Sequence, residues 1–325
     1  MKIATFVYSR YISSRGFGRS FWSFIRGMLI RMFNDPVCTL PVHGQPLDVP
    51  LSHALPDRLT RLPFYDRLPQ RISEYLHSKG EPFSCIDVGA NIGDTLAAFH
   101  LQDSDVFLAI EPNPKFNRIL SANWGMNPNV RILDCLCSAR SDEGTYQIRE
   151  TTGTASIHSS DDGLRLSKRT LDEIVADHPA AARANVVKID TDGYDFEVIA
   201  GARKLLSANQ PALLFECADM KKPNYAEECL EALKLLEGAG YREALVYDNY
   251  GYLMGRYSLS DLRPFRNLLF YQLTSRFHYF DVLCMKDADI EAFYSKETHF
   301  FTSSVSNEAK RIAAAYAAQS QRELQ

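Results

Sequence analysis

The sequence predicts an α/β fold, a Rossmann-like and mostly parallel seven-stranded sheet with helices on both faces. Two observations lead to this prediction. Short apolar segments alternate with helix-prone segments from residue 83 onward, a pattern typical of a parallel sheet that is covered on both faces. The first apolar segment is followed by a glycine-containing turn and a helix-prone run, which is the order of a strand, a tight turn and a helix start.

The alternation also predicts the individual elements. A helix at about 66–78 should lead into the sheet, and a terminal helix is expected at 307–323. Between them we expect strand 83–88, helix 94–101, strand 105–110, helix 114–124, strand 130–136, strand 185–190, helix 195–207, strand 211–217, helix 225–239, strand 242–248 and strand 279–285.

Composition divides the chain into four expected segments. Residues 1–35 form a basic amphipathic segment, and residues 36–80 form a proline-rich covering segment with a helix. Residues 81–290 form the α/β domain, and residues 291–325 form a C-terminal helical extension.

The turn after the first strand favours an adenosyl ligand that lacks phosphates. It reads Gly89-Ala90-Asn91-Ile92-Gly93, and Asp87 lies just before it in the strand. Such a turn places backbone N–H groups and a positive helix end against a nucleotide-like ligand. The phosphate-binding pattern Gly-x-x-x-x-Gly-Lys-Ser/Thr is absent, and so are the three glycines of a dinucleotide site.

A second acidic residue supports a nucleoside ligand. Glu111 ends the second predicted strand about twenty residues after the turn, where an acid can accept hydrogen bonds from both ribose hydroxyls. Pro112 and Pro114 stop the strand and hold the acid at its carboxyl end. We therefore expect Glu111 to bind ribose.

Three ordered motifs resemble the FkbM family of S-adenosylmethionine-dependent methyltransferases. They are Asp-Val-Gly-Ala-Asn-Ile-Gly at 87–93, Glu-Pro-Asn-Pro at 111–114 and Lys-Ile-Asp-Thr-Asp-Gly-Tyr-Asp at 188–195, and Pro-Ala-Leu-Leu-Phe-Glu follows at 211–216. The resemblance covers roughly residues 84–285. It implies a class I methyltransferase fold with an antiparallel last strand, S-adenosyl-L-methionine as cofactor, and O-methylation of a hydroxyl on a sugar, glycan or natural product.

The resemblance also implies a set of cofactor-binding residues, and it has one departure. The implied cofactor-binding residues are Asp87, Gly89, Ala90, Asn91, Gly93, Glu111, Pro112 and Asn113. Family members usually read Lys-Ile-Asp-Val-Glu-Gly-x-Glu, whereas this chain has Asp192 and Asp195 at the two glutamate positions. Negative charge is kept there, but each side chain is one methylene shorter.

Three residues are candidates for catalysis: Asp190, Asp192 and His158. Asp190 ends a predicted strand and could take a proton from an acceptor hydroxyl, although it could equally cap the following turn. His158 lies in a predicted polar loop at 151–158 and could serve as a base near neutral pH. Asp190, Asp192 and Glu216 could alternatively hold Mg²⁺, although nothing in the sequence requires a metal.

Other polar groups and other functions stay open on the sequence alone. Tyr247, Asp248, Asn249, Tyr250 and Tyr252 could shape a sugar site or form an ordinary polar turn. A non-catalytic adenosyl-binding or membrane-associated scaffold is one alternative function. A nicotinamide-dependent oxidoreductase is another, and the missing Gly-x-Gly-x-x-Gly pattern weighs against it.

Composition constrains the partners and the compartment. The net charge of −4 argues against nucleic-acid binding driven by bulk electrostatics. Seven cysteines without regular spacing indicate buried thiols in a reducing compartment, so we expect a cytoplasmic protein. Cys135 and Cys137 have no second ligand pair nearby, so zinc is not expected.

The N-terminal segment has its own pattern. Residues 1–34 contain six basic residues and no acidic residue, and 15–33 form a basic amphipathic helix in which Arg26 and Arg31 interrupt the apolar run. These arginines argue against a signal peptide and make the segment a poor membrane span. Peripheral contact with a membrane through 15–33, packing on the domain surface and an organellar transit peptide remain as interpretations.

Overall fold

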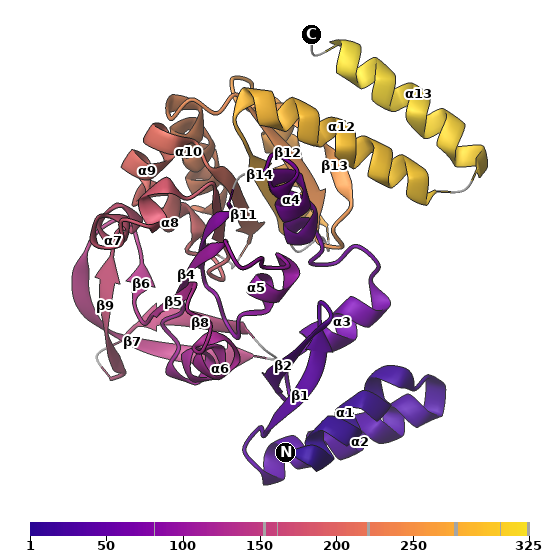
Figure 1. The fold of residues 1–325 in the computed structure, drawn as a ribbon, viewed down its shortest axis with the longest axis vertical. Helices are drawn as coiled ribbons and strands as arrows, with labels where there is room; N and C mark the ends of the chain where they lie inside the picture. Colours follow the sequence, from indigo (N-terminus) through magenta and orange to yellow (C-terminus); the bar gives the residue numbers. More distant parts are fainter. Residues whose placement is uncertain are drawn as a thin grey trace.

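The computed structural model describes residues 1–80, 82–151, 154–160, 162–219, 222–275, 279–305 and 307–323. Within these ranges the central sheet has eight strands in the order β13-β12-β14-β11-β10-β3-β4-β5 (Figure 1). The strands are β13 (Leu253–Ser258), β12 (Glu243–Asp248), β14 (Tyr279–Cys284), β11 (Ala212–Ala218), β10 (Val186–Ile189), β3 (Ser84–Val88), β4 (Val106–Ile110) and β5 (Val130–Leu133).

The pairing of these strands is that of a class I methyltransferase. Strands β5, β4, β3, β10 and β11 run parallel, and the order reverses between β3 and β10. Strand β14 is antiparallel to both β11 and β12, as expected for the last strand. Each of the seven predicted strands is present. The eighth, β13, was not predicted and extends the edge as a hairpin partner of β12.

Helices cover both faces of the sheet because strand residues alternate in direction. Val187 faces one core with Val198 and Leu233, whereas its neighbour Val186 faces the other core with Ile72 and Phe293. On the first face lie α7 (Leu171–Asp177), α8 (Asp195–Ala200), α9 (Arg203–Asn209), α10 (Tyr225–Gly238) and α11 (Arg263–Thr274). On the second lie α4 (Leu68–His77), α5 (Asp94–Ala98) and α12 (Asp287–Ser304). The other helical elements described after residue 61 are α6 (Pro114–Trp124), a 3₁₀ turn (Ala181–Arg183) and α13 (Asn307–Glu323).

The predicted helix 195–207 is wrong in one respect, because it forms two helices. Helix α8 ends at Ala200 and α9 begins at Arg203. Gly201 lies at the break, where a Cβ atom would be 2.1 Å from the backbone oxygen of Ser138. The chain turns there because only glycine permits this close backbone contact.

A second, smaller sheet follows β5. Its order is β6-β9-β7-β8, with β6 (Leu136–Cys137), β9 (Leu164–Arg169), β7 (Asp142–Thr151) and β8 (Thr154–Ser159). The prediction of a polar loop at 151–158 is therefore wrong for the residues described, since Thr151 ends β7 and His158 lies in β8, paired with Gln147. Residues 152 and 153 lie outside the described ranges. Small polar residues on both sides of this hairpin hide the apolar alternation that normally marks a strand.

The first 61 residues fold onto the domain. Helices α1 (Lys2–Ser13) and α2 (Gly16–Met32) lie side by side, followed by the hairpin β1 (Val37–Val42) and β2 (Gln45–Pro50) and by α3 (Leu55–Arg61) (Figure 1). A shared core joins Val7 and Leu40 to Ile92 and Phe116 of the domain. The first part of the proline-rich stretch pairs as the β1–β2 hairpin, which the sequence did not predict. None of the described helices has the length and apolar character needed to cross a membrane.

Candidate active site

The turn after β3 is fixed by close backbone packing. Gly89 has φ +82°, and a Cβ atom on it would lie 1.9 Å from the backbone oxygen of Asp190. The Gly89 and Ala90 N–H groups donate to the Ile110 carbonyl at 2.9 and 3.0 Å. Gly93 has φ +83°, and its carbonyl accepts a hydrogen bond from the Trp124 indole at 2.9 Å. Glycine is required at both positions because the backbone is left-handed and crowded.

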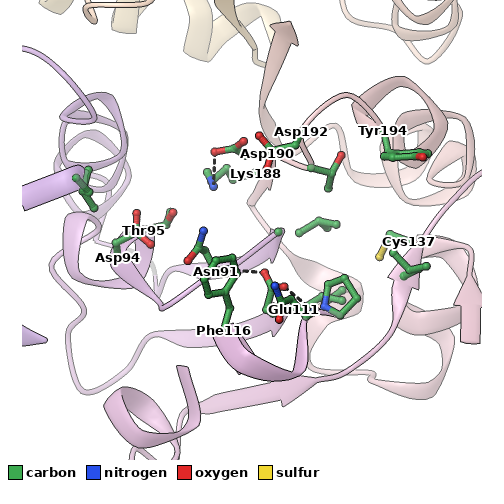
Figure 2. Close-up of a pocket in the computed structure, with 18 of the residues that line it drawn as sticks. Asn91, Asp94, Thr95, Glu111, Phe116, Cys137, Lys188, Asp190, Asp192 and Tyr194 are labelled. Carbon is green, nitrogen blue, oxygen red and sulfur yellow. Dashed lines mark hydrogen bonds and ion pairs between the residues drawn. The ribbon is translucent and has the colours of Figure 1, made fainter. Parts of the chain in front are cut away.

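Glu111 is held at the end of β4 by backbone donors. The Asn91 N–H and the Asn113 N–H each donate to one carboxylate oxygen at 2.8 Å. Burial nevertheless raises the pKa of Glu111 to about 7, since the two N–H bonds only partly offset the cost of removing the charge from water. The side chain of Asn113 caps α6 by accepting from the Lys115 N–H. A carboxylate with a near-neutral pKa thus faces the cavity beside the turn (Figure 2).

Lys188 lies between two carboxylates beneath the strand ends. Its ammonium is 3.4 Å from an Asp87 oxygen and 3.3 Å from an Asp190 oxygen. Figure 2 shows Lys188 beside Asp190. Burial alone would lower the pKa of Lys188, but the two aspartates raise it well above its ordinary value. Burial raises the pKa of Asp87, whose side chain has no solvent exposure, and Lys188 opposes that shift. The lysine therefore links β3 to β10 by charge.

These strand ends border a cavity of about 250 Å³, which we call the first cavity. Five of the predicted cofactor residues line it: Gly89, Asn91, Glu111, Pro112 and Asn113. Asp87, Ala90 and Gly93 do not line it. Asp87 is buried against Lys188, Ala90 packs in the core, and Gly93 is covered by Trp124. These three residues shape the turn from behind.

The proline-rich segment supplies one wall of the first cavity, which the sequence did not predict. His53, Ala54, Leu55, Arg58, Tyr65 and Asp66 line it. The backbone carbonyl of His53 accepts hydrogen bonds from the Tyr8 hydroxyl on α1 and from Arg26 on α2. Asn123 joins the hairpin to the turn by donating to the Asp48 and Ile92 carbonyls at 3.0 and 2.9 Å. The wall is therefore held in place by both N-terminal helices.

His53 itself is buried and neutral at physiological pH. Burial lowers its pKa to about 4, and the nearby Asn91 side chain partly opposes this. Its Nδ1 accepts from the Leu55 N–H at 3.3 Å. Its Nε2 lies near Asn91 but makes no hydrogen bond of ordinary geometry to a described residue. The Asn91 side chain is therefore a polar neighbour of this ring at the cavity wall.

A second cavity of about 370 Å³ adjoins the first at the carboxyl end of β10. Six residues line both cavities: Arg58, Tyr65, Asp66, Lys188, Asp190 and Asp192. The second cavity is rich in carboxylates and aromatic rings. Its carboxylates include Glu216 on β11, Asp219 just after β11, and Asp281 on β14. Phe64 and Tyr279 contribute aromatic rings to its walls. Tyr247 and Asn249 of the predicted aromatic-polar cluster also line it, whereas Asp248 accepts from the Tyr250 and Tyr252 N–H groups in a turn.

Two acids of the second cavity lie beside each other on neighbouring strands. Glu216 and Asp281 are direct partners in the antiparallel pairing of β11 with β14. Burial raises the pKa of each well above its ordinary value, and the negative charge of Asp190 adds to both shifts. Burial therefore favours the protonated form of both carboxyls, and a protonated carboxyl can donate as well as accept hydrogen bonds.

The three catalytic candidates have different surroundings. Asp190 is exposed at the junction of the two cavities, with 48% of its side chain accessible, and Asp192 follows it in a left-handed turn with φ +49°. Asp195 is structural, since it accepts from the Thr191 hydroxyl at 2.9 Å and from the Glu216 N–H at 3.3 Å. The backbone of His158 is in β8, and its side chain lies outside the described part of the structure.

The structure also bears on metal binding and on the state of the cysteines. Within the described ranges no group of three or more His, Cys, Asp or Glu residues is placed to hold a metal ion. All seven cysteines are buried and free. Cys135 and Cys137 lie on the wall of the first cavity.

Comparison with known proteins gives one match in sequence and several in structure. Residues 87–243 match the model of the methyltransferase FkbM domain family. No curated protein matches the chain. The solved methyltransferase FkbM from Methylobacillus flagellatus KT is 16% identical, with a TM-score of 0.36 over 64% of this chain and 46% of that chain. Precorrin-6y C5,15-methyltransferase from Geobacter metallireducens GS-15 is 13% identical, with a TM-score of 0.34 over 64% of this chain and 81% of that chain.

The family match covers the strand ends that border the first cavity but not the wall formed by residues 53–66. It begins at Asp87, at the end of β3, and includes the glycine turn, Glu111 and the strand end at Asp190. The strand order and the antiparallel β14 are those of the corresponding fold class. Residues 87–243 of this chain therefore form a methyltransferase domain of the FkbM family.

Proposed function

We propose that the protein transfers a methyl group from S-adenosylmethionine to a hydroxyl group of a sugar, glycan or natural-product acceptor. The observation that carries the proposal is the pair of adjoining cavities that share Asp190. One cavity suits a nucleoside-containing donor, and the other suits a polar acceptor. A group transfer requires two such sites in contact, with a proton acceptor at their junction.

The first cavity fits the cofactor. S-adenosylmethionine, when bound, supplies a methyl group activated by a positively charged sulfur. Glu111 can accept hydrogen bonds from both ribose hydroxyls, since its carboxylate faces the cavity at the end of β4. The apolar side chains of Val88, Ile110 and Phe116 offer a surface for an adenine ring.

The second cavity favours an acceptor with several hydroxyl groups. Glu216 and Asp281 can pair with hydroxyls as donors or acceptors, because burial favours their protonated forms. Tyr65 and Tyr279 lie on the same cavity and offer aromatic surface against which a sugar ring can pack. In the proposed reaction the acceptor oxygen forms a bond to the methyl carbon as the carbon–sulfur bond breaks, and the hydroxyl proton passes to Asp190.

An amine acceptor is the second candidate, and the same cavity motivates it. A ring of carboxylates attracts a cationic ligand as well as a polyol. The two candidates differ in the product bond, since one yields a methyl ether and the other a methylated amine. They also differ in proton demand, because an ammonium must lose its proton before it can react.

The decisive experiment is a transfer assay with isotopically labelled S-adenosylmethionine. Nucleotide-linked and lipid-linked sugars form one panel of acceptors, and matched amino sugars with blocked hydroxyls form the other. We expect label in methyl ether bonds, located by mass spectrometry after fragmentation. Transfer to nitrogen alone would favour the amine candidate. Cofactor binding by calorimetry without transfer to either panel would favour the scaffold alternative.

A further inference from the structure

One face of α2 directs large apolar side chains into solvent. Phe17, Phe21, Phe24, Met28 and Met32 follow one another at intervals of three or four residues, so they lie along one side of the helix. Phe17 is 88% exposed, Phe24 is 70% exposed and Met32 is 65% exposed. We call these five residues the apolar stripe. Ile3 and Phe6 on the neighbouring α1 are also exposed.

The orientation of the stripe is fixed by the opposite face of α2. Leu29 is buried there, and Trp22 and Ile25 pack against the core shared with α1 and the hairpin. Arg26 donates to the Leu51 carbonyl at 2.7 Å, and Arg19 pairs with Asp57 at 2.8 Å. Because apolar residues and two arginines hold this inner face, the helix cannot bury the stripe by simple rotation without losing these contacts.

The charge around the stripe is positive. The first 34 residues contain no acidic residue, although the whole chain has a net charge of −4. Arg19 and Arg26 are used internally, whereas Lys2, Arg10, Arg15 and Arg31 are exposed. An apolar helix face flanked by exposed basic side chains matches the surface of an anionic bilayer, which presents acyl chains beneath negative headgroups.

We propose that α1 and α2 dock on an anionic lipid bilayer through the apolar stripe and these exposed basic residues. The helices would lie in the headgroup region, since none of the described helices can cross a membrane. A second copy of the chain fits this face less well, because a symmetric contact would bring Arg15 and Arg31 close to the same residues of the partner. Figure 1 shows both helices at the outer edge of the molecule, where a bilayer can reach them.

Vesicle co-sedimentation tests the proposal. The full chain should sediment with vesicles of phosphatidylserine and phosphatidylcholine but much less with phosphatidylcholine alone. Phe17→Ser with Phe24→Ser should weaken binding by at least about tenfold, because both side chains would enter the apolar region. Arg15→Gln with Arg31→Gln should weaken it by on the order of fivefold for each charge and reduce its dependence on salt.

A matched control uses apolar residues elsewhere on the surface. Phe270 and Leu273 on α11 are 69% and 50% exposed, so Phe270→Ser with Leu273→Ser removes a comparable apolar surface. This control should bind vesicles as the unmodified chain does. If the Phe17→Ser, Phe24→Ser variant binds vesicles as well as the unmodified chain does, the proposal is overturned. The proposal would also be overturned, in favour of a second copy, by the following result. The unmodified chain and the control dimerise with increasing concentration, the Phe17→Ser, Phe24→Ser variant does not, and none of them binds vesicles.

Discussion

The two cavities that meet at Asp190 are built in different ways. The first is formed largely by backbone at strand ends, namely the glycine turn, the Pro112 bend and two N–H groups that fix Glu111. The second is formed by side chains from distant parts of the chain, such as Tyr65, Glu216 and Asp281. In the first cavity the Glu111 carboxylate is held by backbone N–H donors, whereas in the second Glu216 and Asp281 lie beside each other on paired strands.

This difference fits the two proposed ligands, a cofactor that is the same across a family and an acceptor that differs between proteins. A cofactor that is the same across a family can be bound by backbone geometry, which needs glycine and proline at fixed spacings. An acceptor that differs between proteins is recognised by side chains, which can change without disturbing the sheet. The residues shared by both cavities, above all Lys188 and Asp190, are where the two sites depend on each other.

The largest expected effect separates the two cavities by function. Asp190→Asn should lower turnover by roughly a hundred- to ten-thousandfold, because it removes the proposed proton acceptor while keeping its shape. The affinity for S-adenosylmethionine should change far less, since Glu111 remains. Turnover at saturating cofactor and calorimetric titration measure the two quantities, with circular dichroism to check folding.

His158→Ala is the control for this prediction and should keep its turnover. Loss of activity in His158→Ala with near-normal activity in Asp190→Asn would transfer the proton acceptor to the β8 hairpin. Assays with added Mg²⁺ and with a chelator address the metal alternative, and we expect neither to change the rate.

The second prediction concerns the lysine between the cavities. Lys188→Met should lower the free energy of unfolding by about 3–5 kcal/mol, because Asp87 would be left buried without its ion pair. Denaturant unfolding measures the loss. The double variant Asp87→Asn with Lys188→Met should recover much of it, since no uncompensated buried charge remains. A double variant no more stable than Lys188→Met would show that the loss comes from packing and not from charge.

The sequence predicted the first cavity better than the second for a physical reason. Glycine spacing and strand-ending prolines report local backbone geometry, so the positions of Gly89 and Glu111 follow from neighbouring residues. The strand expected at 83–88 is observed at Ser84–Val88, and the antiparallel last strand is present as β14. The strand at 83–88 needed no knowledge of long-range contacts, whereas the antiparallel direction of the last strand was implied by the family resemblance.

The parts that the sequence did not predict depend on distant segments meeting. His53 and Arg58 reach the first cavity only because α1, α2 and the hairpin pack against the domain. Asp281 joins Glu216 only through the pairing of β14 with β11. The hairpin β7–β8 lacks a clear apolar alternation, so it was interpreted as a loop. Proline residues likewise obscured the β1–β2 hairpin, which tolerates them because it has only two strands.

The third prediction acts on the first cavity alone. Glu111→Gln should weaken binding of S-adenosylmethionine by on the order of a hundredfold, since hydrogen bonds to a charged carboxylate contribute about 1.5–3 kcal/mol each. Isothermal titration calorimetry measures the change. Glu216→Gln is the matched control in the second cavity and should leave cofactor affinity unchanged. Equal weakening by both variants would mean that the two cavities do not divide the ligands as proposed.

The smallest expected effect is a dependence of cofactor affinity on pH. Burial raises the pKa of Glu111 to about 7, and the ionised carboxylate is the form that accepts hydrogen bonds from two hydroxyls. As pH falls below 7 the carboxyl gains its proton, so affinity should decrease by about tenfold for each pH unit and be constant above the pKa. Titration calorimetry between about pH 6 and pH 8 covers the transition expected for a carboxyl shifted in this way.

Asp94 must be separated from Glu111 in this measurement, because it lines the same cavity and burial together with Asp66 raises its pKa to about 7 as well. Glu111→Gln should bind weakly with little pH dependence, whereas Asp94→Asn should keep the dependence of the unmodified chain. If Asp94→Asn removes the dependence while Glu111→Gln retains it, the titrating group is at the start of α5. Glu111 would then keep one protonation state over this range, and the contrast between a first cavity governed by Glu111 and a second governed by paired side-chain acids would no longer hold.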